Sequence, residues 1–271
     1  MYRQRFGLTG HPFPKDCKGK TFFEHSTGFQ RLQRSFQRLL EEPGLGVLTA
    51  DPGLGKTASI RYLCQKLPRP DYQIVYLCDT SVSELDLYRI LALELGVRPS
   101  HRRAQLWHDL KASLLHRVDQ RGTTPILIID EAQRLSDEIL LDLSSFLNFE
   151  FDSRDLFALW LIGLTPFARR FQLQMHEALR TRALVQEHLD PLDRDTFAAF
   201  VDHGLRAVGA TQKLLGDPAL EQLFRCSRGN PRVAAKMVRT ALRLAHERNQ
   251  NFVDDQVMEE AIASLTACAA P

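Results

Sequence analysis

The chain has 271 residues, with 35 basic and 33 acidic side chains and a net charge of +2, a length that suits one large domain or a large and a small one. Apolar residues make up 44% of the chain and charged residues 25%, ordinary globular values that exclude a wholly disordered chain, a collagen and a coiled coil. The longest internal stretch without a charge covers residues 156–168, which is too short for the roughly 20 apolar residues of a membrane-spanning helix.

The first two thirds of the chain predict strands that alternate with helices. Residues 125–130 form an apolar run without polar alternation, which is typical of a strand buried on both faces of a parallel sheet. Apolar residues at helical spacing predict helices between such runs. The expected strands are 46–50, 73–78, 125–130, 156–163 and 185–189, and the expected helices are 28–42, 56–66, 84–95, 103–119 and 137–147. This order predicts an α/β domain with a parallel sheet.

After residue 191 the strand signal stops. Four helices are expected there, at 193–208, 217–226, 231–248 and 254–265. The change in pattern marks a domain boundary near residue 190. We therefore predict an α/β core over residues 1–190, which includes an N-terminal segment over 1–44, and an all-α domain over 191–271.

The strongest chemical signal lies between the first expected strand and the helix after it. Residues 50–57 match the phosphate-loop pattern G-x-x-x-x-G-K-[ST], except that Ala50 replaces the first glycine. Backbone N–H groups and the helix N-terminus would surround the phosphates of ATP, Lys56 would reach the β- and γ-phosphates, and the Thr57 hydroxyl would bind Mg²⁺. The predicted nucleotide-binding residues are Asp51, Pro52, Gly53, Leu54, Gly55, Lys56, Thr57 and Ala58.

A pair of acidic residues follows the apolar strand at 125–130. Asp130 and Glu131 form the Walker B arrangement, although paired acids at a strand end are also common as helix caps. Together with the phosphate loop upstream, they predict that Asp130 holds Mg²⁺ and that Glu131 acts as the general base on the attacking water. The presence of Glu131 favours hydrolysis over nucleotide binding alone.

With these motifs in order, the chain resembles the AAA+ ATPases over nearly its whole length. It is similar in particular to the ExeA (general secretion pathway protein A) branch, which includes the transposition helper ATPases TniB, TnsC and MuB. The residues that match this branch are Tyr2, Phe6-Gly7-Leu8, Pro12-Phe13, Asp130-Glu131-Ala132-Gln133, Asp190-Pro191-Leu192 and Gly229-Asn230-Pro231-Arg232. The resemblance implies an AAA+ P-loop core with a C-terminal helical lid.

The resemblance also implies roles for residues outside the two Walker motifs. Arg232 corresponds to the sensor 2 arginine that touches the nucleotide, and Thr165 is the candidate for sensor 1, with Leu164 as the alternative occupant of that position. The arginine finger, which acts on the ATP of a neighbouring subunit, corresponds to Arg182 or else to Arg180. A finger that acts in trans implies an oligomer, either a ring or a helical filament.

The transposition helpers bind duplex DNA, and this sequence offers a basic segment at the matching place. Its residues are Arg98, Ser100, His101, Arg102 and Arg103, between two expected helices. Such a loop would bind phosphates without reading bases; the alternative is a solvated helix start with Ser100 as its cap. A second row of basic side chains lies on the helix expected at 231–248. It is the weaker candidate for DNA binding because its first member, Arg232, is assigned to the nucleotide.

Three functions remain open from the sequence. The leading hypothesis is an ATP-dependent, sequence-nonspecific DNA-binding ATPase that regulates transposition, with a transposase and a targeting adaptor as partners. Secretion-type relatives continue into membrane and cell-wall parts that this sequence does not contain, so a secretion ATPase is the alternative. A nucleotide-gated switch with little turnover is the third. The five cysteines lack CxxC spacing and no secretory leader is visible, so we expect a cytoplasmic protein without a membrane partner.

Overall fold

The computed structural model describes residues 2–68 and 70–267. Their contacts divide them into two units, and each unit has its own hydrophobic core. One unit comprises Arg31–Asp51 and Ser59–Leu189. The other combines the described residues up to Gln30 with Pro52–Ala58 and with the segment from Asp190 onward.

The first unit contains a five-stranded sheet in the order β2-β3-β4-β1-β5. Every pairing in this sheet is parallel, as the strand–helix alternation predicts. The strands are β1 (Leu45–Ala50), β2 (Tyr72–Leu77), β3 (Thr124–Ile129), β4 (Ala158–Gly163) and β5 (Ala183–Leu189). Because all strands run in the same direction, the residues that follow β1, β3 and β4 meet at one edge of the sheet.

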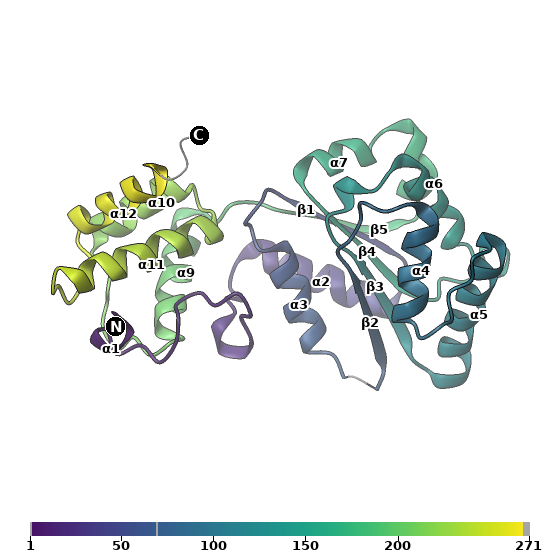
Figure 1. Ribbon diagram of the computed structural model, residues 1–271, viewed down its shortest axis with the longest axis horizontal. Coiled ribbons are helices and arrows are strands. Elements are labelled where there is room, and N and C mark those ends of the chain that lie inside the picture. Colours follow the sequence, from purple (N-terminus) through teal and green to yellow (C-terminus); the bar gives the residue numbers. More distant parts are fainter. Residues whose placement is uncertain (1, 69, 268–271) are drawn as a thin grey trace. The chain divides into compact units, whose positions relative to one another are not determined.

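Helices cover both faces of this sheet (Figure 1). The helices of this part of the chain are α2 (Thr27–Glu41), α3 (Lys56–Gln65), α4 (Glu84–Glu94), α5 (Arg103–Arg121) and α6 (Asp137–Phe146). Alternate strand residues such as Leu159 and Leu161 join the core that α4, α5 and α6 complete. Trp160, between them in sequence, points to the other face and stacks on Phe36 of α2 with ring centroids 5.9 Å apart.

The second unit is built from α9 (Arg194–Arg206), α10 (Asp217–Ser227), α11 (Pro231–Glu247) and α12 (Asp255–Ala267). The first residues of the chain pack into the core of these helices through Tyr2, Phe6 and Leu8. The backbone N–H of Thr9 donates to the carbonyl of Val208 at 2.8 Å. The N-terminal segment therefore packs with the C-terminal helices, whereas the sequence groups it with the core; the boundary at residue 190 stays a prediction.

Each expected strand and helix is present, with ends that differ by no more than two residues from the predicted ones. The short helices α1 (Tyr2–Arg5), α7 (Thr165–Phe171) and α8 (Glu177–Arg180) were not predicted. No helix among the described residues is both long and apolar enough to cross a membrane. Residues 268–271, the end of the expected helical domain, lie outside the described residues.

Candidate functional site

Glycines shape the turn between β1 and α3. Gly53 and Gly55 have φ angles of +89° and +93°, a region that side chains with a Cβ atom rarely adopt. A Cβ on Gly53 would also lie 2.6 Å from Oδ1 of Asn230. Ala50, which replaces the first glycine of the pattern, is the buried last residue of β1, so an alanine fits there without strain.

The turn ends at the N-terminus of α3. Lys56 is the first residue of this helix and is 9% exposed, and Thr57 follows it. Helix starts leave backbone N–H groups without helical partners and carry a partial positive charge, which attracts phosphate groups. An ammonium group, a hydroxyl and a glycine turn together fit the phosphates and Mg²⁺ of a nucleoside triphosphate, because Mg²⁺ keeps few protein ligands beside phosphate oxygens.

The start of α11 contacts this turn. Asn230 caps α11 by accepting hydrogen bonds from the N–H groups of Arg232 and Val233, and its Nδ2 donates to the carbonyl of Pro52 at 2.8 Å. The N–H of Arg232 also lies 3.3 Å from the carbonyl of Gly53. The side chain of Arg232 is exposed. The predicted sensor 2 residue therefore lies beside the phosphate loop, and Asn230 holds it there.

The Walker B carboxylate is buried at the end of β3. Asp130 is 3% exposed; its Oδ1 accepts the N–H of Glu131 at 2.8 Å, and its Oδ2 accepts the hydroxyl of Tyr76 at 2.9 Å. Burial, followed by the charge of Asp130, raises the pKa of the Tyr76 hydroxyl above its usual value. The sequence analysis missed Tyr76. No local pattern in the sequence marks Tyr76, because it reaches Asp130 only through the pairing of β2 with β3.

Glu131 is joined to the end of β4 through Gln133. The Nε2 of Gln133 donates to Oε2 of Glu131 at 2.5 Å, and its Oε1 accepts the N–H of Leu164 at 3.1 Å. Thr165, the first residue of α7, donates its hydroxyl to Oδ1 of Asp51 at 2.5 Å. Both candidates for sensor 1 therefore lie in a turn that connects the start of the phosphate loop with the Walker B segment.

The two candidate arginine fingers lie at the opposite edge of the sheet. Ala183, which follows Arg182, pairs with Leu45 at the start of β1, whereas Leu189 pairs with Ala50 at its end. At about 3.3 Å per residue the length of β5 separates Arg182 from the edge with Asp51 and Glu131 by roughly 20 Å. Arg182 therefore cannot reach that edge in its own subunit.

Both of these arginines have partners within their own subunit. Arg182 forms an ion pair with Asp152 at 2.5 Å and lines an open depression of about 450 Å³ at the amino ends of β4 and β5. Arg180 donates to the carbonyl of Gln172 at 2.9 Å. The depression lies at the end of the sheet opposite to Asp51 and Glu131.

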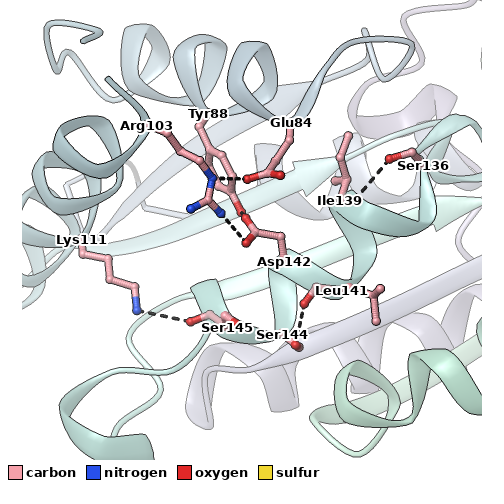
Figure 2. Close-up of polar contacts among 10 residues, drawn as sticks. All are labelled: Glu84, Tyr88, Arg103, Lys111, Ser136, Ile139, Leu141, Asp142, Ser144 and Ser145. Carbon is pink, nitrogen blue, oxygen red and sulfur yellow. Dashed lines mark hydrogen bonds and ion pairs between the residues drawn. The ribbon is translucent and has the colours of Figure 1, made fainter. Parts of the chain in front are cut away.

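Figure 2 shows the contacts that hold Arg103 within the first unit, which contains the sheet. Its guanidinium pairs with Glu84 at 2.5 Å and with Asp142 at 2.6 Å, and it lies 5.1 Å from the ring centroid of Trp107. The hydrogen bond to Glu84 is the largest cause of its raised pKa. The hydroxyl of the buried Tyr88 donates to the same Asp142 at 2.6 Å. Arg103 thus ties α4, α5 and α6 together.

The other members of the predicted DNA-binding segment are placed differently. Arg98, His101 and Arg102 are exposed, and they form no ion pair within the described part of the chain. Ser100 accepts the N–H of Arg102 at 3.2 Å, whereas the cap position of α5 is Arg102 itself. Ser100 is therefore not the helix cap, and three basic side chains of the segment face solvent.

The chain resembles known proteins in sequence and in fold. Residues 38–171 match the family model described as "AAA domain". The chain is 29% identical over 255 residues to general secretion pathway protein A of Aeromonas hydrophila; the match covers 93% of this chain and 46% of that protein. The chain thus spans about half the length of this curated relative.

Two solved structures illustrate the similarity in fold. Aeropyrum pernix ORC1, solved in complex with DNA, matches with a TM-score of 0.66 at 16% identity, over 96% of this chain and 69% of that one. The RuvB Holliday junction branch migration motor of Thermotoga maritima matches with a TM-score of 0.57 at 18% identity, over 88% and 67%. The expected fold, an α/β P-loop ATPase core with a helical C-terminal part, is therefore confirmed.

Proposed function

We propose that this chain, which matches the AAA domain model over residues 38–171 and is similar to general secretion pathway protein A, is an AAA+ ATPase that hydrolyses ATP as an oligomer and binds duplex DNA in its ATP-bound form. The placement of Glu131 and Arg182 at opposite edges of one sheet carries the proposal. One subunit has a general base but not a finger that reaches it. Two neighbouring subunits together supply both.

Each site residue has one task in this mechanism. Lys56 and the N-terminus of α3 neutralise the phosphates, and Thr57 and Asp130 would hold Mg²⁺, which would neutralise charge on the phosphate oxygens. Glu131 takes the proton of the attacking water. Arg232 binds the nucleotide from the helical unit, and Arg182 of the neighbouring subunit stabilises the charge of the transition state, a contribution of roughly 10³–10⁵ in GTPases.

Duplex DNA is the partner that the exposed basic segment suits. Arg98 and Arg102 present positive charge that no acidic side chain of the described residues neutralises. Phosphate contacts of this kind give affinity without sequence preference, and affinity then falls steeply with salt. Two proteins of the same fold act on DNA by their descriptions. Within this proposal, the motif resemblance to transposition helpers favours regulation of a transposase.

The test measures binding to a fluorescent duplex by anisotropy, with ATP, with ADP and without nucleotide. We expect binding only with ATP or a non-hydrolysable analogue, and none for Lys56→Ala. The double variant R98E/R102E should bind the duplex at least about tenfold more weakly. Each lost phosphate contact reduces the number of counterions that binding releases, and this release drives the association. The matched control R206E/K213E reverses two exposed charges of the helical unit and should bind normally. Equal binding without nucleotide would contradict the proposal.

A second candidate is an ATPase that assembles secretion machinery. The observation that favours it is the match to general secretion pathway protein A, which extends over 93% of this chain. In that case duplex DNA changes neither ATP turnover nor the oligomeric state, and R98E/R102E behaves like the control. Glu131→Gln separates both functions from a switch with little turnover, because only an enzyme loses activity and traps ATP.

A further inference from the structure

A continuous set of hydrogen bonds joins the start of the phosphate loop with the general base. The hydroxyl of Thr165 donates to Asp51. Leu164, the preceding residue, donates its N–H to Oε1 of Gln133, and Nε2 of Gln133 donates to Oε2 of Glu131. Each of these contacts lies within the sheet-containing unit. Among the described residues, Gln133 is the side chain whose hydrogen bonds join the turn after β4 to Glu131.

The chemistry of the two partners fixes the orientation of the Gln133 amide. A backbone N–H can only donate, so the carbonyl oxygen of Gln133 must face Leu164. A carboxylate can only accept, so the amide nitrogen must face Glu131. A flipped amide would lose both bonds and would place two oxygens against each other. The side chain therefore has one orientation that satisfies both neighbours.

Other contacts fix the backbone of Glu131, so Gln133 acts on the side chain of Glu131 alone. The backbone of Glu131 is already fixed, because its φ angle is +56° and its carbonyl accepts the hydroxyl of Thr80 at 3.1 Å. Of its two carboxylate oxygens, Oε2 is held by Gln133. Oε1 accepts no hydrogen bond from the described residues. One oxygen is thus anchored while the other is free to orient a water molecule.

We propose that Gln133 is a positioning residue for hydrolysis, which aims the Glu131 carboxylate at the attacking water and ties that aim to the turn of Leu164 and Thr165. The inference rests on the proposed ATPase function and adds a residue to its mechanism. It requires that Gln133 acts on turnover and not on nucleotide affinity, since its side chain bonds to the base and to the β4–α7 turn.

The experiment compares two substitutions that break different bonds. Gln133→Met keeps the length of the side chain and removes both hydrogen bonds. Gln133→Glu keeps an oxygen that accepts the N–H of Leu164 but loses the donor to Glu131. Gln37→Met, at an exposed glutamine of the same unit whose amide donates to the carboxylate of Glu41 at 3.1 Å, is the matched control. Steady-state ATP turnover, affinity for a fluorescent ATP analogue with Mg²⁺, and thermal unfolding are measured for each.

We expect both Gln133 variants to lose roughly 10- to 100-fold in kcat, the order of loss that a misplacement of about 1 Å causes. Affinity for the analogue should stay within a few-fold of the parent protein. Lowering the pH should raise the kcat of Gln133→Glu relative to that of the parent protein. The introduced carboxyl group, once protonated, can again donate a hydrogen bond to the Glu131 carboxylate. The ratio of the kcat of Gln133→Met to that of the parent protein should not change with pH.

Several results would overturn the inference. Parent-like turnover of Gln133→Glu at every pH would mean that only the bond to Leu164 matters, and faster turnover of Gln133→Met would mean that Gln133 restrains the base. A parallel loss of kcat and affinity would indicate a structural role. Glu131→Gln separates this inference from the proposed function: if that variant keeps full turnover, the proposed base is wrong, whatever Gln133 does.

Discussion

Burial separates cysteines that are chemically alike. Cys64 in α3 is 8% exposed, and burial raises the pKa of its thiol to about 12. Cys78 and Cys226 are exposed. The thiolate is the reactive form of cysteine. We therefore expect the Cys64 thiol to stay protonated and unreactive at neutral and mildly alkaline pH.

This difference predicts the order of alkylation by iodoacetamide at pH 8. Cys78 and Cys226 should be labelled within minutes, whereas Cys64 should remain unlabelled until the protein is unfolded in denaturant. Peptide mass spectrometry of native and unfolded samples measures the labelling at each position. The raised pKa keeps Cys64 in its thiol form below about pH 12. Raising the pH from 7 to 9 should therefore not increase the labelling of Cys64. Rapid native labelling of Cys64 would show that α3 opens readily.

Single residues show where sequence reasoning succeeds and where it stops. Asp130 and Glu131 could be found because a motif fixes their position after an apolar strand. Tyr76 could not, because it meets Asp130 only through the pairing of β2 and β3, 54 residues apart. Arg103 and Arg102 are adjacent in one basic run, yet Arg103 is paired with two carboxylates. Charge in a sequence does not tell which arginine is already neutralised.

At the scale of elements, the N-terminus of α11 performs two tasks. Asn230 caps the helix through its side-chain oxygen and holds the phosphate loop through its side-chain nitrogen. A capping oxygen is supplied equally well by aspartate. The bond to the carbonyl of Pro52, in contrast, requires the amide N–H. The two tasks can therefore be separated by substitution.

Asn230→Asp should keep the stability of the protein but weaken ATP binding. The carboxylate caps α11 but repels the carbonyl of Pro52 and the phosphates, so we expect affinity for a fluorescent ATP analogue to fall roughly tenfold. Asn230→Ala loses the cap as well, at a cost of about 1 kcal/mol, which lowers the unfolding midpoint by about 2–4 °C. Ser136→Ala removes the cap of α6 and should leave ATP affinity unchanged. Parent-like affinity of Asn230→Asp would refute the anchoring role.

The long elements could be predicted because their patterns are unambiguous. Every residue of β4 is buried, and a continuous apolar run of that length is typical of a central parallel strand. The helices α7 and α8 were missed because seven and four residues are too few for a helical period to show. The packing of Tyr2 and Phe6 among the C-terminal helices was also missed, since contacts between the ends of a chain leave no local pattern.

At the scale of the whole molecule, the sheet separates the proposed base from the proposed arginine finger. The carboxyl edge presents Asp130 and Glu131, and the amino edge presents Arg182 beside Asp152. A parallel sheet places these two edges a full strand length apart. In the proposed ring or filament, repeated head-to-tail contacts would bring the amino edge of one subunit to the carboxyl edge of the next. The oligomer is therefore required for catalysis in this mechanism.

Mixing two inactive variants tests this requirement most directly. Arg182→Ala keeps its own base and lacks a finger, and Glu131→Gln keeps its finger and lacks a base. We expect each variant alone to turn over ATP at least about 100-fold more slowly than the parent. An equal mixture should recover roughly a quarter of parental turnover, since random assembly gives that share of interfaces both intact groups. A mixture as inactive as its components, or full activity of Arg182→Ala alone, would contradict catalysis across subunits.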